Sequence, residues 1–378
     1  MGDRLSILFL ADSLVFGGAE KHTVTLANRL DISKFRLGLV YLKSMEHLLP
    51  ELDCDRLDGV CCADFGRGMN WRGLFWLANY VKRWQPDVVV CVNQYPLFFG
   101  YLARLLSRVP FRIVEVFHTT ELRDARSRRH QKIYQWFFNH SDRVVYVSQN
   151  QRRYWEARGI RVDRGECIHN GIDTEHFRDH LDDHEKAALR ARFSFSTEDF
   201  VVGICAALRP EKRHVDLLEA VAQMRARGLS AKCLIIGDGP MRAEIESRID
   251  ALMLTDHVAI SGFQADVRPF LSICDCMAIV SDAVETFSIA ALEAMALGKP
   301  IVVSDIGGAS EQVEHGENGF LFPRGDIRCL ADHLCSLSNR VQQERLGGRA
   351  REIVERRFGV NKMIREYSKL FHRIGVQQ

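Results

Sequence analysis

The sequence predicts an α/β protein with two parallel sheets, each in its own domain. Short β-branched runs alternate with helix-length segments along the whole chain, a pattern that builds parallel sheets with helices on both faces. At 378 residues the chain is too long to fold around one ordinary hydrophobic core. A polar stretch at 173–199 separates two halves of similar length. In sheets of this kind ligands bind at the carboxyl ends of the strands, so the functional residues are expected in the loops that follow strands.

The first half contains six predicted strands and three clear helical segments. Each strand is a short apolar run that ends at polar or turn residues, and each helix shows apolar residues at a helical period. The predicted strands are Leu5–Ala11, Arg36–Leu42, Asp87–Val92, Arg112–Phe117, Arg143–Val147 and Glu166–His169, and the helices are Ala19–Leu30, Trp71–Trp84 and Arg126–Asn139.

The second half repeats the alternation and ends in an amphipathic segment. Because no strand follows that segment, we expect it to pack back across a domain. The predicted divisions are an N-terminal domain at 1–172, a linker at 173–199, a second domain at 200–358 and a C-terminal helix at 359–378. The strands predicted in the second domain are Phe200–Ala206, Lys232–Gly237, His257–Ser261, Asp275–Val280, Pro300–Ser304 and Gly319–Phe322.

Composition excludes several classes of protein. No apolar run approaches the roughly 18–20 residues that span a bilayer, and Leu5–Ala11 suits a first strand better than a signal peptide. Eleven cysteines, without a Cys-x-x-Cys pair, indicate a reduced, cytoplasmic protein. Net charge is +2, divided as +7 over 1–172 (25 Lys+Arg, 18 Asp+Glu) and −5 over 173–378 (26 and 31). A basic N-terminal half suits an anionic acceptor or a membrane surface, with an ordinary soluble surface as the alternative.

The most informative stretch is residues 284–298. Glu285 and Glu293 lie eight positions apart, with a polar turn and the start of an apolar helix between them. Glu285 belongs to a loop that leaves a strand, and Ser288 lies at the helix start, where free N–H groups favour an anion. A carboxylate would repel a lone phosphate there, but it can accept hydrogen bonds from hydroxyls. The pattern therefore predicts a ligand with both phosphates and hydroxyls, such as a nucleotide-sugar.

Other loops after strands hold weaker signals. Gly17 and Gly18 open a helix and allow close approach of a ligand, or form only a tight turn. His118 directly follows a strand, where a structural role is the alternative. Arg209 and Lys212 lie in a loop where cations would neutralise phosphates, or would form a solvated cationic turn. Two further strand-end loops contain Gly239 and Phe263; the second loop could read a base edge, or Phe263 could be a core residue.

Several other chemistries find little support. The triplet Asp53-Cys54-Asp55 matches an Asp-x-Asp metal pattern, but such a triplet is common by chance, so we expect no metal. A nucleophile elbow, a phosphate loop ending in Lys-Ser/Thr and the dinucleotide fingerprint are all missing from the sequence. No recognised module suggests nucleic-acid binding.

Taken in order, these segments resemble the retaining glycosyltransferases of the GT-B fold, family-4 type. The similarity rests on Glu285 and Glu293 with the continuation to Gly298 and Pro300, supported by Gly17-Gly18-Ala19-Glu20, His118 and Asn170–Asp173. The matches run from about residue 7 to 322. The resemblance implies two Rossmann-like domains that face each other across a cleft, and transfer of a sugar from a nucleoside-diphosphate donor without metal or other cofactor.

The same resemblance implies roles for individual residues. Glu293 would bind the ribose hydroxyls and Glu285 the hydroxyls of the donor sugar. Lys212 would stabilise the departing diphosphate. Gly18, beside Gly17, would lie against the diphosphate and sugar, and His118 would contact the sugar near its reacting carbon. Backbone amides for the diphosphate would come from Phe287, Ser288 and Ile289.

One position departs from the family pattern. The arginine usually found five residues before the lysine is Ala207 here. Arg209, two residues later on the same side of an extended backbone, is predicted to replace it. If Arg209 did not do so, the loss of one preorganised donor would cost roughly 10²–10³ in rate.

The acceptor is expected at the N-terminal domain, in 66–71, 93–99 or 119–132. It would be a glycan, free or lipid-linked. The basic run before Tyr134 and Trp136 could contact anionic lipid at the inner face of the membrane, and a solvated helix with an aromatic core face is the alternative. Rival functions are a sugar-nucleotide epimerase of the same fold, a non-catalytic nucleotide-sugar-binding subunit and, less consistent with the motifs, an NAD-dependent oxidoreductase.

Overall fold

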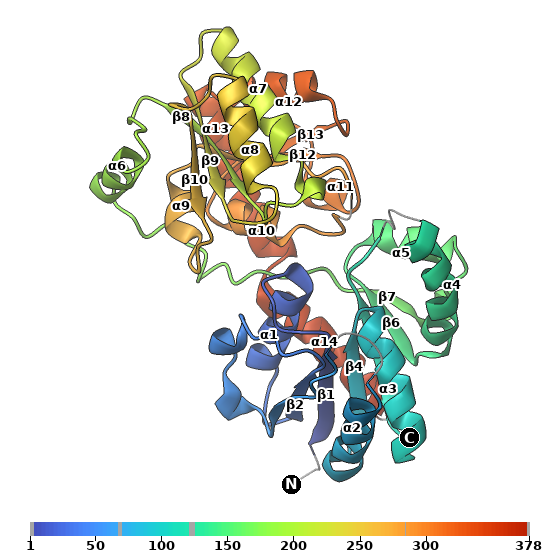
Figure 1. The fold of residues 1–378 in the computed structure, drawn as a ribbon. Helices are drawn as coiled ribbons and strands as arrows, with labels where there is room; N and C mark the ends of the chain where they lie inside the picture. The colour runs from blue at the N-terminus through green and yellow to red at the C-terminus, as the bar shows by residue number, and fades with distance from the viewer. Residues whose placement is uncertain (1–3, 67–69, 121–124, 284, 376–378) are drawn as a thin grey trace. The chain divides into compact units, whose positions relative to one another are not determined.

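The computed structural model describes residues 4–66, 70–120, 125–283 and 285–375, without the side chains of 125–131 and 162. The chain divides into two compact units, each built around one parallel sheet (Figure 1). The first unit comprises 1–170 and 361–378, and the second comprises 171–360. This confirms the predicted fold class of two parallel-sheet α/β domains.

Among the described residues the first unit holds a seven-stranded parallel sheet in the order β3-β2-β1-β4-β5-β6-β7. Its central strands form because continuous apolar, β-branched runs suit a sheet that is covered on both faces. In β4, for example, all five residues are buried. The strands are β1 Leu5–Ala11, β2 Phe35–Tyr41, β3 Val60–Cys62, β4 Val88–Val92, β5 Arg112–Phe117, β6 Arg143–Tyr146 and β7 Gly165–Cys167.

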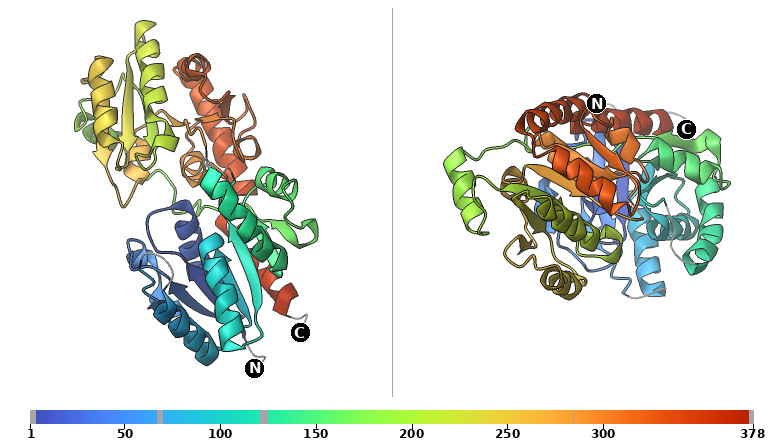
Figure 2. Two further views of the ribbon diagram at one scale, coloured as in Figure 1. Left: turned by 45° about the vertical axis from the view of Figure 1, so that its right-hand side comes forward. Right: turned by 90° about the horizontal axis from the view of Figure 1, so that it is seen from above.

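The helices of the first unit cover both faces of this sheet. Helices α2, α3, α4 and α5 share a hydrophobic core cluster with β4, β5 and β6. Helix α14 lies beside α1, where the ring centroids of Tyr367 and His22 are 5.4 Å apart (Figures 1 and 2). The C-terminal helix α14 therefore belongs to the first unit. The helices are α1 Gly18–Arg29, α2 Trp71–Trp84, α3 Gln94–Ser107, α4 Ala125–His140, α5 Gln149–Glu156 and α14 Val360–Gly375.

The second unit has a six-stranded parallel sheet, within its described residues, in the order β10-β9-β8-β11-β12-β13. Helices α7, α8 and α12 pack together over one face, and α10 packs against α13 (Figure 1). The strands are β8 Phe200–Cys205, β9 Ala231–Ile236, β10 Val258–Gly262, β11 Cys276–Ile279, β12 Ile301–Ser304 and β13 Gly319–Phe322. The helices are α6 Asp183–Ala191, α7 His214–Ala226, α8 Arg242–Ala251, α9 Arg268–Ser272, α10 Ile289–Ala296, α11 Ala309–Gln312, α12 Ile327–Ser336 and α13 Arg340–Arg357.

The stretch 173–199, expected as a linker, is part of the second unit and contains α6. Arg190 of α6 pairs with Asp275 through two hydrogen bonds of 2.9 and 3.0 Å at the start of β11. The segments at which the chain enters and leaves this unit also lie side by side. Ile172 and Gly359 form a parallel bridge, closed by hydrogen bonds from Ile172 N–H to Phe358 O (2.9 Å) and from Val360 N–H to Ile172 O (2.8 Å).

One strand was missed by the sequence reasoning. Strand β3 has three half-buried residues at the sheet edge, too few to show an alternating pattern. All eleven cysteines, which lie within the described residues, are free thiols. In the described part of the chain no helix is both long and apolar enough to cross a membrane.

Candidate active site

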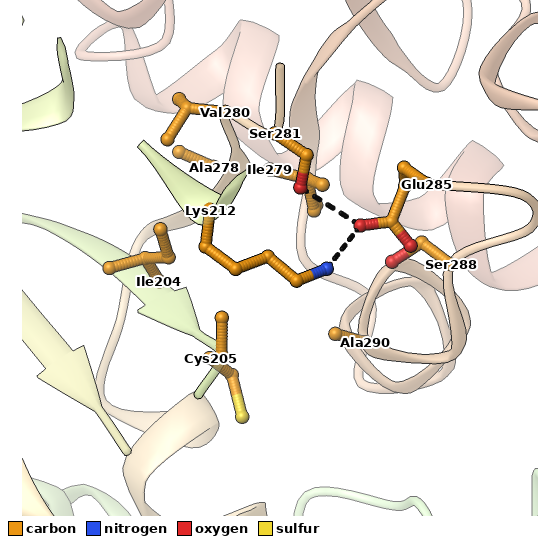
Figure 3. Close-up of a pocket in the computed structure, with 11 residues that line it drawn as sticks. Ile204, Cys205, Lys212, Ala278, Ile279, Val280, Ser281, Glu285, Ser288 and Ala290 are labelled. Atoms are coloured by element: carbon orange, nitrogen blue, oxygen red, sulfur yellow. Dashed lines mark hydrogen bonds and ion pairs between the residues drawn. The ribbon is translucent and has the colours of Figure 1, made fainter. Parts of the chain in front are cut away.

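The centre of the predicted donor site is an ion pair in the second unit. Lys212 ends the short 3-10 helix η4 (Pro210–Lys212), which follows β8, and Glu285 lies in the loop between β11 and α10. Lys212 Nζ donates to Glu285 Oε2 at 2.5 Å, and Ser281 Oγ donates to the same oxygen at 2.9 Å (Figure 3). The structure thus brings together two residues 73 positions apart that were predicted to serve the same ligand.

The loop that carries Glu285 is fixed by neighbouring backbone. Gly308 N–H donates to Thr286 O at 2.9 Å, and Asp282 N–H donates to Glu211 O at 3.0 Å, which ties the Glu285 loop to the Lys212 loop. Gly307 has φ +56°, and a Cβ there would collide with the carbonyl oxygen of Glu285. Because only glycine fits this approach, the turn after β12 places the Glu285 backbone.

Helix α10 begins at Ser288, whose hydroxyl accepts from the N–H of Ala291 at 3.3 Å. The buried Gln312 side chain bonds the Ser288 backbone twice, accepting from its N–H at 3.2 Å and donating to its carbonyl at 2.8 Å. The Ser288 amide predicted to bind diphosphate is therefore already bonded in this structure. In the first turn of α10, no described group accepts from the N–H groups of Ile289 and Ala290.

A pocket of about 240 Å³, counted with its opening to solvent, lies at the carboxyl ends of β8 and β11. Lys212, Ser281, Glu285 and Ser288 supply its polar lining (Figure 3). The apolar part comes from residues at and just past the ends of the two strands and from Ala290 of α10. Glu293 lies in α10 and is 4% exposed, and the Glu285 side chain is 13% exposed. Glu285 lines the pocket, whereas Glu293 is not among its lining residues, so the pocket itself contains one of the two predicted carboxylates.

The remaining predicted residues of the second unit lie in the loops that follow β8, β9 and β10. Arg209 is exposed, and no described residue pairs with its side chain; Ala207 is exposed as well. Gly239 faces the Leu208 backbone, where a Cβ would come within 2.6 Å of the Leu208 carbonyl oxygen. The two loops therefore touch through a glycine. Phe263 is 51% exposed, so it is not the core residue that was the alternative.

In the first unit, the glycine loop leads into α1. Gly17 is the N-cap and Gly18 the first helical residue. A Cβ on Gly17 would collide with the Glu20 carboxylate, so glycine leaves room for that side chain. The loop before it is held by the 2.9 Å ion pair between Lys43 and Asp12 and by Leu14 N–H, which donates to Met45 O at 2.8 Å.

His118 is the first residue after β5. Its N–H donates to Asn93 Oδ1 at 3.0 Å, and its ring meets that of His22 edge to face, with centroids 4.9 Å apart. Burial lowers the pKa of His118 to about 4, so the ring is neutral at physiological pH. Burial and the neighbouring His118 ring also lower the pKa of His22. A neutral imidazole can donate one hydrogen bond and accept another.

The segments expected to meet the acceptor are described in part. Residues 67–69 and 121–124 lie outside the described residues, as do the side chains of Arg126, Arg128 and Arg129. Among the described ones, Trp71 is 62% and Trp136 54% exposed, whereas Phe138 is fully buried. Helix α4 thus presents an aromatic residue to solvent and another to the core.

Comparisons with known proteins identify the family. Residues 16–176 match the model for glycosyltransferase family 4, and residues 185–353 match that for glycosyl transferases group 1. N-acetyl-alpha-D-glucosaminyl L-malate synthase of Bacillus anthracis is 31% identical over 49% of this chain and 48% of its own, so that match spans about half of either protein. Alpha-D-kanosaminyltransferase of Streptomyces kanamyceticus is 23% identical over 80% of this chain and 82% of its own.

Solved structures agree with this. HepE of Anabaena, in complex with UDP and glucose, is 25% identical with a TM-score of 0.83 over 98% of this chain and 100% of its own. The chain belongs to the group 1 glycosyltransferases, with the GT-B fold. It is therefore an enzyme of the glycosyltransferase class, as the double-glutamate stretch predicted.

Proposed function

We propose that the protein transfers a sugar from a nucleoside-diphosphate-sugar to a hydroxyl of a glycan, free or lipid-linked, with retention of configuration and without a metal. The observation that supports this best is the Lys212–Glu285 pair beside the first turn of α10. It places a cation, a carboxylate and open backbone N–H groups around one pocket. A ligand with both phosphates and hydroxyls matches that set of groups.

In this proposal Lys212 leaves Glu285 for the diphosphate when the donor binds. Glu285 then accepts from hydroxyls of the sugar, and Ser281 keeps its carboxylate in place. Glu293 accepts from the ribose hydroxyls. The diphosphate takes N–H groups of Phe287, Ser288 and Ile289, with Ser288 releasing Gln312 if its own amide is used. Gly239 and Phe263 contact the nucleoside.

The positive charge needed at the leaving group comes from the protein. Lys212, Arg209 in place of the arginine missing at Ala207, and the helix dipole of α10 neutralise the diphosphate as its bond to the sugar breaks. The acceptor oxygen bonds to the anomeric carbon on the same face, and its proton passes to the departing phosphate oxygen. His118, neutral and partly enclosed, contacts the sugar near that carbon, and Gly17 and Gly18 lie against the diphosphate and sugar.

The acceptor is proposed to meet the first unit. Exposed Trp71 and Trp136 offer flat apolar surfaces on which a sugar ring or a lipid-linked glycan could lie. Several relatives are named for glycan synthesis, such as the amylovoran biosynthesis glycosyltransferase AmsK of Erwinia amylovora. Contact with the inner face of a membrane through the basic N-terminal unit, in a cytoplasmic protein, stays part of this proposal.

The test is a panel of UDP-, GDP-, ADP- and CMP-sugars with nucleotide release as readout, beginning with UDP-sugars because of the HepE complex. Slow release of the nucleoside diphosphate from one donor supports the proposal if acceptor glycans accelerate the release and EDTA does not change it. NMR of the product's anomeric proton decides between retention and inversion. Conversion of the donor to another sugar-nucleotide would instead identify an epimerase, and binding without turnover a non-catalytic subunit.

A further inference from the structure

The backbone at His118 is held by two side chains, one from each of the segments that follow the neighbouring strands β4 and β6. On one side, Asn93 follows β4 and has φ +68°, an unusual value for a residue other than glycine. Its N–H donates to Val116 O at 3.0 Å, and its Oδ1 accepts from His118 N–H at 3.0 Å. The Asn93 side chain therefore continues the β4–β5 hydrogen bonding one step past the end of β5.

On the other side, Gln151 does the same between β5 and β6. This residue in the first turn of α5 has no exposed surface. Its Nε2 donates to Phe117 O at 2.8 Å and to Thr119 O at 3.0 Å, and its Oε1 accepts from Val147 N–H at 2.9 Å. A side-chain amide has the same donor and acceptor groups as a peptide. Gln151 therefore extends the hydrogen bonding between β5 and β6 one step beyond the last backbone pair of the two strands.

We propose that Gln151 is a positioning residue that holds the ring of His118 in its working orientation by fixing the carbonyls on both sides of it. The inference rests on the proposed function, in which His118 contacts the donor sugar. One amide bonds the residue before His118 and the residue after it, so the Cα–Cβ direction of His118 cannot turn without breaking a buried hydrogen bond.

Further contacts restrict the same ring. Trp155 Nε1 donates to Thr119 O at 2.8 Å, which gives that carbonyl a second donor. The His118 ring meets His22 of α1, which in turn lies edge-on to Tyr367 of α14 at 5.4 Å. Ring contacts alone are not directional, so they would allow the His118 side chain to shift. The hydrogen bonds of Gln151 are directional, and they fix the position of the backbone that carries the side chain.

The same strand pair contains a matched control at its opposite end. Asp142 precedes β6, and its Oδ2 accepts from Ile113 N–H of β5 at 2.8 Å. Like Gln151, Asp142 supplies a side-chain hydrogen bond between β5 and β6, but it does so at the amino ends of the strands. A loss of β5–β6 stability should follow from changes at either end, and a loss of His118 geometry only from Gln151.

The first experiment compares Gln151→Leu with Asp142→Ala in donor turnover and thermal stability. We expect both variants to melt earlier. Gln151→Leu should lower kcat by about tenfold to a hundredfold, because a misplacement of about 1 Å has an effect of this size. Its KM for the donor should change less than about threefold, since diphosphate and ribose are held by the second unit. Asp142→Ala should keep kcat. Equal kcat losses in the two variants, or none in Gln151→Leu, overturn the proposal.

A second variant keeps the shape of the side chain. In Gln151→Glu the ionised form cannot donate to Phe117 or Thr119, while the protonated form can donate to one of them. The activity of Gln151→Glu relative to wild type should therefore fall as the pH rises, whereas the relative activity of Gln151→Leu stays flat. A flat ratio for both variants contradicts the assigned hydrogen bonds.

NMR of histidine-labelled protein tests positioning without turnover, with His118→Gln used to assign the signal. In wild type the His118 ring should titrate with a midpoint near pH 4, because burial lowers its pKa to about 4. In Gln151→Leu the two carbonyls beside His118 lose these bonds, so the ring should lose part of its burial and the midpoint should move toward 6.5, the unperturbed value. An unchanged midpoint and line shape overturn the proposal. If wild type releases nucleotide from no donor, the proposed function fails, and this measurement still decides whether Gln151 positions His118.

Discussion

Replacing Lys212 with methionine separates a catalytic cation from a structural one. Lys212 Nζ lies 2.5 Å from Glu285 Oε2, with side chains 26% and 13% exposed. At an effective dielectric constant of about 20 the attraction across that distance is roughly 6–7 kcal/mol. Desolvation and side-chain entropy offset most of it, which leaves a net contribution of about 1–3 kcal/mol for a pair between fully exposed and fully buried. Lys212→Met should therefore remain folded.

The effect on the rate should be larger than the effect on stability. The loss of one preorganised donor at a developing negative charge costs roughly 10²–10³ in kcat, or about 2.7–4 kcal/mol. The assay is the initial rate of nucleoside-diphosphate release at saturating donor and acceptor, with the free energy of unfolding measured by urea titration. A second variant, Glu285→Gln, closes a double-mutant cycle that isolates the coupling between the two side chains.

Lys232→Met is the matched control. Lys232 lies in β9, is buried and donates to Asp256 O at 2.8 Å, so this variant removes a lysine that lies outside the pocket lining and is more buried than Lys212. We expect a loss of stability with an unchanged rate. If Lys212→Met keeps more than about a third of the wild-type kcat, or if Lys232→Met loses as much, the assignment of Lys212 to the leaving group is refuted.

Three other variants test separate parts of the structure. Arg209→Ala should lower kcat roughly a hundredfold to a thousandfold, as expected for the loss of one preorganised donor. The free energy of unfolding should not change, because the exposed Arg209 side chain pairs with no described residue, and unchanged turnover would rule out its role in place of an arginine at position 207. Gln312→Leu removes two buried hydrogen bonds to the Ser288 backbone, so the free energy of unfolding should fall by about 1–3 kcal/mol. Calorimetry should show roughly tenfold weaker binding of the donor's nucleoside diphosphate. Equal affinity in the variant and wild type would contradict a role of Gln312 in shaping the diphosphate site. Burial raises the pKa of Glu115 well above its ordinary 4.5, so the folded state retains a proton that the unfolded chain releases. The contribution of this proton to stability is complete below pH 4.5 and declines by roughly 1.4 kcal/mol per pH unit up to the folded pKa. Urea denaturation should therefore show the free energy of unfolding of Glu115→Gln rising relative to that of wild type from pH 4.5 to 7. A difference that does not change with pH would contradict the raised pKa of Glu115.

Much of the fold was readable because local patterns and tertiary environment agree. The continuous apolar runs of β1, β4 and β8 are what a sheet covered on both faces requires, and helix α2 begins and ends at the predicted residues. Strand β3 escaped prediction, since three half-buried residues at an edge have no period to detect. The stretch 173–199 looked like a linker by polarity, yet the Arg190–Asp275 pair holds its helix α6 on the second unit.

The site divides in a similar way. Glu285, Glu293, Lys212 and His118 were selected from their places after strands and from a family pattern. The residues that hold them were not, because Ser281, Gln151 and Gln312 belong to no motif. Ser281 bonds Glu285 only four positions away, whereas the two glutamines also bond residues that are distant in sequence. Gln312 lies 24 residues from Ser288, and Gln151 lies 34 from Phe117. Such side chains could be suspected only as amides within otherwise apolar surroundings, a weak signal without coordinates.

By itself the sequence determined the alternation of strands and helices, the loops that carry charge, and the pairing of acidic residues with a helix start, since these depend on neighbours close along the chain. Only the tertiary structure decided which loops meet: that Lys212 bonds Glu285, that Gly307 makes room for the Glu285 carbonyl, and that the Ser288 amide is bonded to Gln312. These contacts join residues far apart in sequence, and their geometry follows from how the strands order themselves in the sheet.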